Sequence, residues 1–194
     1  MRYFILRSAG DGDNDRLMIS GISQHLPRIR GCIQLERIGP FVPPLSLPGQ
    51  EIVVNERMLS LLRASPYRTW DTVQVIKAHV SRVDWPIDSQ HDSRGEPEDQ
   101  ILGLPHDQAC ADELGELKEL VPPAGALASR VSFSEEYDKC QLRCSTFSGG
   151  DLFFTMLPGG RRVLCSETFK NWLESLDGVS CWIRFIPVEI TVSP

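Results

Sequence analysis

Short runs of hydrophobic residues, some alternating with polar ones, predict β-strands along much of the chain. The first is residues 2–7 (RYFILR), rich in aromatic and branched side chains that favour strands. Brief apolar runs occupy residues 52–54 and 163–165, and longer ones occupy residues 72–80 and 179–190. These runs predict a molecule built largely from sheet.

Two of the strands run directly into segments with helical periodicity. In each segment three hydrophobic residues recur at i, i+3 and i+4, which gives a helix one buried face. They are Met58, Leu61 and Leu62 in the first segment and Phe169, Trp172 and Leu173 in the second. Asn55 and Ser166 precede these segments, where their side chains can accept a hydrogen bond from an unpaired amide of the first turn. We therefore expect two short, capped helices.

The two helical segments belong to similar stretches of sequence. LPGQEIVVNERMLSLL (47–62) and LPGGRRVLCSETFKNWL (157–173) both open with Leu-Pro-Gly, a turn signal, and both are followed by a strand. The similarity indicates a duplicated turn–strand–helix–strand unit; alternatively, two units common in mixed α/β proteins match by chance. Either interpretation predicts an α+β fold, with a mixed or antiparallel sheet and a few packed helices.

A polar stretch rich in prolines separates the two halves of the chain. It covers residues 86–125, and its hydrophobic spacing predicts one short helix over residues 109–121, ended by Pro122. We therefore expect an N-terminal α+β lobe (1–85), a linker with one short helix, and a C-terminal α+β lobe (126–194).

Negative charge is concentrated in this linker. The 194-residue chain has 20 Lys and Arg against 26 Asp and Glu, a net charge of −6, which argues against a general nucleic-acid-binding protein. Between Asp88 and Glu119, ten acidic residues stand against two basic ones, so this stretch carries −8 and the rest of the chain +2. Such a segment either keeps a linker solvated or presents a surface to a basic partner.

The composition and the N-terminal segment indicate a cytoplasmic protein. Hydrophobic residues make up 41% of the chain and charged residues 24%, ordinary values for a globular domain. No apolar run approaches the length of a membrane-spanning helix. The start, MRYFILRSAGDGD, lacks the long apolar run and the cleavage site of a secretory signal. We expect a reducing environment, in which the six cysteines form no structural disulfides.

Cysteine and histidine spacing raises the question of a zinc site. Cys140 and Cys144 form a CxxxC and His106 and Cys110 an HxxxC, whereas structural zinc sites typically use tighter CxxC turns. This loose spacing argues against a zinc site. The sequence also lacks the nucleophile-elbow, phosphate-loop, dinucleotide-binding and HExxH motifs. We therefore expect no cofactor and no enzymatic activity, and binding as the function.

The C-terminal part of the chain combines a strand, a Ser-Glu-x-Phe helix start and a Gly-Val strand that ends in Phe-x-Pro-Val. These positions are Ser166, Glu167, Phe169, Gly178, Val179, Phe185, Pro187 and Val188. With the opening MRYFILR and the central IVVNERMLSLLRA, this layout resembles bacterial polymorphic-toxin immunity proteins, namely the myxobacterial double-CxxCG paralogue family and the related immunity family eleven. The chain departs from the double-CxxCG pattern, because only Cys32 stands in the early region and Cys140 and Cys144 are one residue too far apart. The resemblance thus implies a fold and a role, not a metal.

The resemblance implies a cytoplasmic immunity protein that binds a cognate secreted toxin and blocks its active site or substrate access. Carboxylates suit this role, because they can occupy a cationic active site and speed association by electrostatic steering. We therefore expect acidic residues of the linker to contact the toxin; the candidates are Asp112, Glu113, Glu116, Glu119, Glu96, Glu98 and Asp99. We expect no nucleic-acid or membrane partner. Two other interpretations remain open: a small enzyme or ligand-binding domain with a site assembled from distant residues, and an acidic adaptor with several partners.

Overall fold

The chain forms two compact units built mainly from strands. The computed structural model describes residues 1–8, 26–38, 43–48, 50–82, 103–134, 138–157, 160–179 and 182–193. Within these residues, many strands and three helices confirm the α+β class. One unit, here called the barrel unit, contains residues 1–9, 60–71 and 120–194; the other, the acidic unit, contains residues 10–59 and 72–119.

The two units differ from the lobes expected in chain order. The first nine residues belong with the C-terminal part of the chain, because β1 (Tyr3–Ser8) pairs with two C-terminal strands. The described part of the expected linker, residues 103–125, contributes a helix and strands to the folded units instead of joining them as a solvated spacer. The boundaries expected at residues 85 and 125 therefore do not coincide with those of the compact units.

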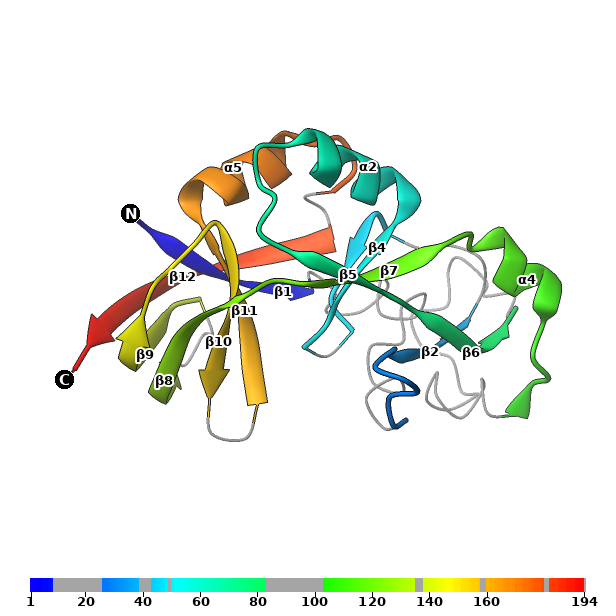
Figure 1. Ribbon diagram of the computed structural model, residues 1–194, viewed down its shortest axis with the longest axis horizontal. Coiled ribbons are helices and arrows are strands. Elements are labelled where there is room, and N and C mark those ends of the chain that lie inside the picture. The colour runs from blue at the N-terminus through cyan, green and yellow to red at the C-terminus, as the bar shows by residue number, and fades with distance from the viewer. Residues whose placement is uncertain are drawn as a thin grey trace. The chain divides into compact units, whose positions relative to one another are not determined.

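Six strands close into a barrel in the barrel unit (Figure 1). They are β1, β8 (Ala124–Phe133), β9 (Cys140–Phe147), β10 (Leu152–Leu157), β11 (Gly160–Ser166) and β12 (Ile183–Val192). Their order around the barrel is β1-β11-β10-β8-β9-β12, with β8 parallel to β10, β9 parallel to β12 and the other pairs antiparallel. The expected strand over residues 2–7 is confirmed as β1. The strand expected from residue 179 begins only at Ile183, since a turn with Gly178 at a φ of 70° precedes it.

Alternate residues of these strands fill the barrel interior. The core residues are Ile5, Ala126, Ala128, Cys140, Leu142, Cys144, Phe153, Leu164 and Ile186. Tyr3, Phe147 and Phe153 meet edge to face, with ring centroids 5.2 to 6.0 Å apart, an arrangement that aromatic quadrupoles favour. On the outside, α5 (Glu167–Ser175) packs against β1 and β11.

Both expected helices and both expected caps are confirmed. α2 covers Glu56–Ala64 and begins where the Met58 N–H donates to Asn55 Oδ1 at 3.0 Å. α5 begins where the Phe169 N–H donates to Ser166 Oγ at 3.2 Å. Met58, Leu62, Phe169 and Leu173 are buried, whereas Leu61 and Trp172 are partly exposed. No helix formed by the described residues is long and apolar enough to span a membrane.

Both similar stretches of sequence fold as an antiparallel hairpin, a helix and a further strand. The first hairpin joins β3 (Leu45–Ser46) to β4 (Ile52–Asn55), and the second joins β10 to β11. The strand expected over residues 72–80 is split into β5 (Asp71–Gln74) and β6 (Ile76–Ser81). The split occurs because β5 and β6 belong to different sheets. The order of elements expected from the sequence is therefore confirmed, with this one interruption.

Two small sheets and one short helix build the acidic unit. β2 (Gln34–Ile38) pairs with β6 in parallel, and β7 (Leu117–Val121) lies between β4 and β5 in a sheet of order β3-β4-β7-β5. α4 covers only Gln108–Glu113. The helix expected over residues 109–121 is therefore wrong beyond Leu114, because Gly115 takes a φ of 64°, outside the helical region, and the chain then enters the sheet as β7.

Candidate protein-binding surface

The segment from α4 to β7 carries four of the seven acidic residues expected to bind a partner. Asp107 caps α4, since the Cys110 N–H donates to Asp107 Oδ1 at 2.9 Å. At the other end the Gly115 N–H donates to the Asp112 carbonyl at 3.0 Å, which closes the turn after the helix. The local sequence thus defines a short helix with a tight exit, and the acidic residues stand around that exit.

This segment is fixed to β6 by packing and by one lysine. Cys110, Ala111 and Leu114 form a buried cluster with Val80 of β6. The Lys77 ammonium, also from β6, donates to the carbonyl of Ala111 and, at 3.2 Å, to the carbonyl of Gly115. Cations suit the end of a helix, where carbonyls lack partners. The backbone that carries the acidic residues is therefore held in one conformation.

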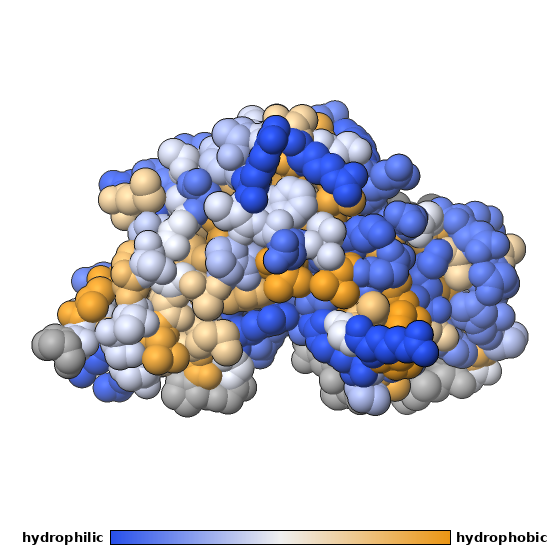
Figure 2. Space-filling model, in the orientation of Figure 1, coloured by the Kyte–Doolittle hydropathy of each residue, from blue (hydrophilic) through white to orange (hydrophobic). Residues whose placement is uncertain are grey.

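Three of the expected carboxylates are exposed on this segment. Asp112 accepts a hydrogen bond from Gln108 Nε2 at 2.8 Å, Glu113 pairs with Arg82 at 2.6 Å, and Glu116 pairs with Lys118 at 3.4 Å. The side chains of Glu113 and Glu116 are 52% and 67% exposed. Exposed ion pairs contribute little to stability, so a cationic partner can compete for these carboxylates. Figure 2 shows mainly hydrophilic side chains over α4.

Glu119 does not belong to this surface. Its side chain is only 1% exposed, and both carboxylate oxygens accept hydrogen bonds from the Arg28 guanidinium at 2.7 Å. The alternation in β7 places Glu119 on the same face as buried Leu117. The expectation that Glu119 contacts a partner is therefore corrected to a structural role. Glu96, Glu98 and Asp99 lie outside the described residues.

The four residues considered above as zinc ligands belong to two different units. Cys140 and Cys144 face the barrel core, and His106 and Cys110 belong to the acidic unit. His106 Nδ1 accepts the Val80 N–H at 3.0 Å, a structural contact. Burial raises the pKa of the Cys140 thiol to about 11 and also raises that of Cys144, which opposes the thiolate form that zinc requires. Within the described ranges, no three His, Cys, Asp or Glu residues are placed to hold a metal.

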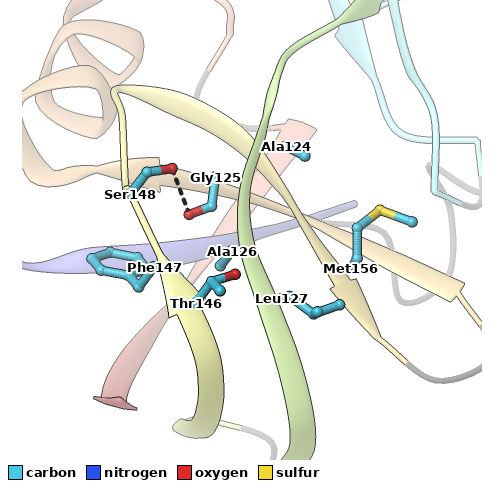
Figure 3. A pocket seen from close by; sticks show the side chains of 8 residues that line it. All are labelled: Ala124, Gly125, Ala126, Leu127, Thr146, Phe147, Ser148 and Met156. Carbon is cyan, nitrogen blue, oxygen red and sulfur yellow. Dashed lines mark hydrogen bonds between the residues drawn. The ribbon is translucent and has the colours of Figure 1, made fainter. Parts of the chain in front are cut away.

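A shallow pocket of about 280 Å³ opens on the barrel unit between β8, β9 and β10 (Figure 3). It is lined by Ala124, Gly125, Ala126, Leu127, Thr146, Phe147, Ser148 and Met156. Ser148 Oγ donates to the Gly125 carbonyl at 3.1 Å, and Leu127 and Met156 are 50% and 43% exposed. The lining contains no titratable side chain, so the pocket offers contact area and no acid–base chemistry. No pattern in the sequence predicted this pocket.

The charge of the chain divides unequally between the two units. The acidic unit has 17 acidic and 9 basic residues, a net charge of −8, whereas the barrel unit has 9 acidic and 11 basic residues, a net charge of +2. Comparisons with protein-family models, with curated proteins and with solved structures gave no match. The functional assignment therefore depends on these residues alone.

Proposed function

We propose that the chain binds and neutralises a cognate toxin in the cytoplasm, with Asp112, Glu113 and Glu116 contacting a cationic surface of that toxin. The observation that supports this proposal most directly is the fixed backbone under these exposed carboxylates. Because Lys77 and the buried cluster hold the segment in place, binding costs little backbone entropy. The net charge of −8 on the same unit would also accelerate encounter with a basic partner.

The role of the exposed carboxylates is to occupy the toxin surface that binds substrate. A toxin that acts on an anionic substrate presents cationic groups there, and carboxylates held near each other can replace that substrate. The proposal therefore predicts tight binding with a single partner. The acidic adaptor interpretation predicts several weaker partners instead.

A rescue assay in a heterologous bacterium tests this function. The reading frame adjacent to this gene is induced with and without the chain. Growth arrest that co-expression relieves, together with a stoichiometric co-purified complex, would support the proposal. The proposal would be contradicted if the protein encoded by the adjacent reading frame is harmless, or if the chain fails to relieve its toxicity.

Charge reversal tests the proposed surface. The triple variant Asp112→Lys, Glu113→Lys, Glu116→Lys should weaken binding of the co-purified toxin at least about tenfold at physiological salt, mainly through slower association. A matched triple variant of exposed carboxylates elsewhere, Asp71→Lys, Glu174→Lys and Glu189→Lys, makes the same change in net charge. Equal loss of affinity in both variants, or none in the first, would refute this surface.

A further inference from the structure

Three arginines gather at one end of the barrel. Arg7, Arg162 and Arg184 lie on β1, β11 and β12, with β1 between the other two strands. Each stands two residues along its strand from a core residue. These core residues are Ile5, Leu164 and Ile186. Side chains two residues apart share one face of a strand, so the three arginines continue the inward face beyond these core residues. Arg7 and Arg184 are exposed there, and Arg162 is partly exposed.

Among the described residues, no ion pair offsets the positive charge of these arginines. Arg7 and Arg184 are direct partners in the β1–β12 register, and like charges at facing positions destabilise a sheet. Within the described part of the chain, none of the three arginines forms an ion pair; Arg162 Nη1 donates to the Arg161 carbonyl at 3.0 Å. The pKa of Asp138 is lowered first by the hydrogen bond from Ser134 and to a lesser extent by nearby cations, Arg184 among them. Among the described residues, Asp138 is thus a carboxylate that feels the charge of Arg184 without forming an ion pair with it.

A buried hydroxyl group without a partner lies next to Arg162. Thr155 is the direct partner of Arg162 in the β10–β11 register and shares its face with core residue Phe153. Thr155 is fully buried, and its Oγ1 has no hydrogen-bond partner. Burial raises the pKa of the Cys140 thiol in the core, and the positive charge of Arg162 offsets part of this rise. The charge of Arg162 therefore acts on the barrel interior. Leaving a buried hydroxyl unpaired is unfavourable. The unpaired Thr155 hydroxyl therefore indicates that a ligand supplies its hydrogen-bond acceptor.

We propose that Arg7, Arg162, Arg184 and Thr155 bind a phosphate-type oxyanion, either inorganic phosphate or the phosphate of a monoester. A guanidinium group donates parallel hydrogen bonds that match phosphate oxygens. A dianion would remove the repulsion between Arg7 and Arg184 and would accept the free hydrogen of Thr155 Oγ1. One ligand therefore accounts for both unfavourable features of this end of the barrel.

Binding of phosphate to the full-length chain tests this site. Titration calorimetry with inorganic phosphate and with adenosine monophosphate should show saturable binding at millimolar concentration or below, and chloride at equal ionic strength should show none. Tighter binding of the nucleotide would assign the ligand as a monoester, and equal affinity would assign it as the free anion. Absence of saturable binding by both probes would overturn the proposal.

Matched arginine variants separate this site from general charge. Arg162→Gln and Arg184→Gln should each weaken phosphate binding about tenfold, the scale of a charge-assisted hydrogen bond. Arg130→Gln and Arg143→Gln provide the control, because Arg130 and Arg143 also face each other, on β8 and β9, but are exposed on the outer surface of the barrel. Equal weakening by the control variants would refute the site.

Thr155→Val tests the buried hydroxyl even if an arginine variant fails to fold. Valine keeps the shape and removes the unpaired group, so the variant should unfold a few degrees higher than the parent without phosphate. With phosphate, it should show a smaller rise in unfolding temperature than the parent. An unchanged rise would contradict the assignment of Thr155. The carboxylates proposed to bind a toxin lie on the other unit, so failure here would leave that proposal unaffected.

Discussion

Arg28 and Glu119 form a bidentate ion pair in which the carboxylate is buried and the guanidinium is not. Nη1 and Nη2 of Arg28 donate to the two Glu119 oxygens, each at 2.7 Å. The carboxylate side chain is 1% exposed and the guanidinium side chain 38%. Arg28 also lies 3.4 Å from Glu51, and its pKa is raised, first by the hydrogen bond to Glu119. A buried carboxylate is tolerated when both oxygens are paired, so the acidic unit depends on this contact.

Glu119→Gln should lower the free energy of unfolding by about 2 kcal/mol. Glutamine keeps the size of the side chain but replaces one accepting oxygen by an NH2 group, which cannot accept a hydrogen bond from Arg28. The positive charge of Arg28 is then left without its closest partner. Urea denaturation of parent and variant measures the change. Glu116→Gln is the control, because Glu116 is 67% exposed and should change stability by less than about 0.5 kcal/mol. Equal losses in the two variants would contradict a special role for the buried pair.

Removal of the two helix caps should cost different amounts of stability. Asn55→Ala should lower the free energy of unfolding by about 1 kcal/mol, the usual value for a lost cap. Ser166→Ala should cost about 2 kcal/mol, because the fully buried Ser166 Oγ also donates to Asp151 Oδ1 at 2.7 Å. The variant removes this bond as well as the cap and leaves Asp151 Oδ1 with only the longer hydrogen bond from Thr168 Oγ1, at 3.2 Å. Urea denaturation measures both. Asn55→Asp, which retains an accepting oxygen, should be nearly neutral; a loss as large as that of Asn55→Ala would argue against capping.

Local signals in the sequence predicted the elements that local contacts determine. The caps at Asn55 and Ser166 and the apolar spacing of α2 and α5 are complete within one or two helical turns, so these helices could be placed from sequence. The spacing of Leu114 and Leu117 fits a helix equally well. The prediction that the helix continues through Leu117 was wrong because β7 is held between β4 and β5, which come from residues far away in the chain.

The candidate sites depend on contacts that no short stretch of sequence contains. The charge of Glu119 suggested an exposed surface, but its partner Arg28 stands 91 residues earlier. Likewise, Arg7 and Arg184 face each other only because the barrel closes between its first and last strands. Exposed carboxylates close to each other in sequence could be predicted; a cluster assembled by barrel closure could not.

Gly125→Ala should destabilise the barrel unit by about 3 kcal/mol. A Cβ atom at this position would lie 2.4 Å from the Phe153 ring and 2.8 Å from the Gly149 carbonyl oxygen, and overpacking a rigid core typically costs 1 to 3 kcal/mol. Thermal unfolding followed by near-ultraviolet circular dichroism measures the change. Gly103→Ala is the control, since a Cβ there meets no atom within 4 Å. Replacing Phe153 by leucine in the Gly125→Ala background should recover part of the loss; no recovery would place the strain elsewhere.

The buried cysteines should react only when the protein unfolds. Burial raises the pKa of Cys140 to about 11 and raises that of Cys165, which is also fully buried. At pH 8 these thiols are therefore protonated and inaccessible, and alkylation requires a thiolate. Iodoacetamide labelling followed by mass spectrometry should modify the partly exposed Cys32 at least about a hundredfold faster than either of them, because buried thiols are reached only through rare opening. Comparable rates would contradict the closed barrel core.

The same thiols should make the folded state less stable at high pH. Unfolded cysteines lose their protons near pH 9, whereas folded Cys140 retains its proton up to about pH 11. Between these values the unfolded state binds fewer protons than the folded state, so the free energy of unfolding falls as the pH rises. Because lysines and tyrosines also titrate there, the measured quantity is the difference between parent and Cys140→Ala in urea denaturation from pH 8 to 11. The difference should be constant below about pH 9 and shrink above it, since only the parent carries the titrating thiol. A difference that stays constant to pH 11 would mean that Cys140 ionises as freely in the barrel as in water.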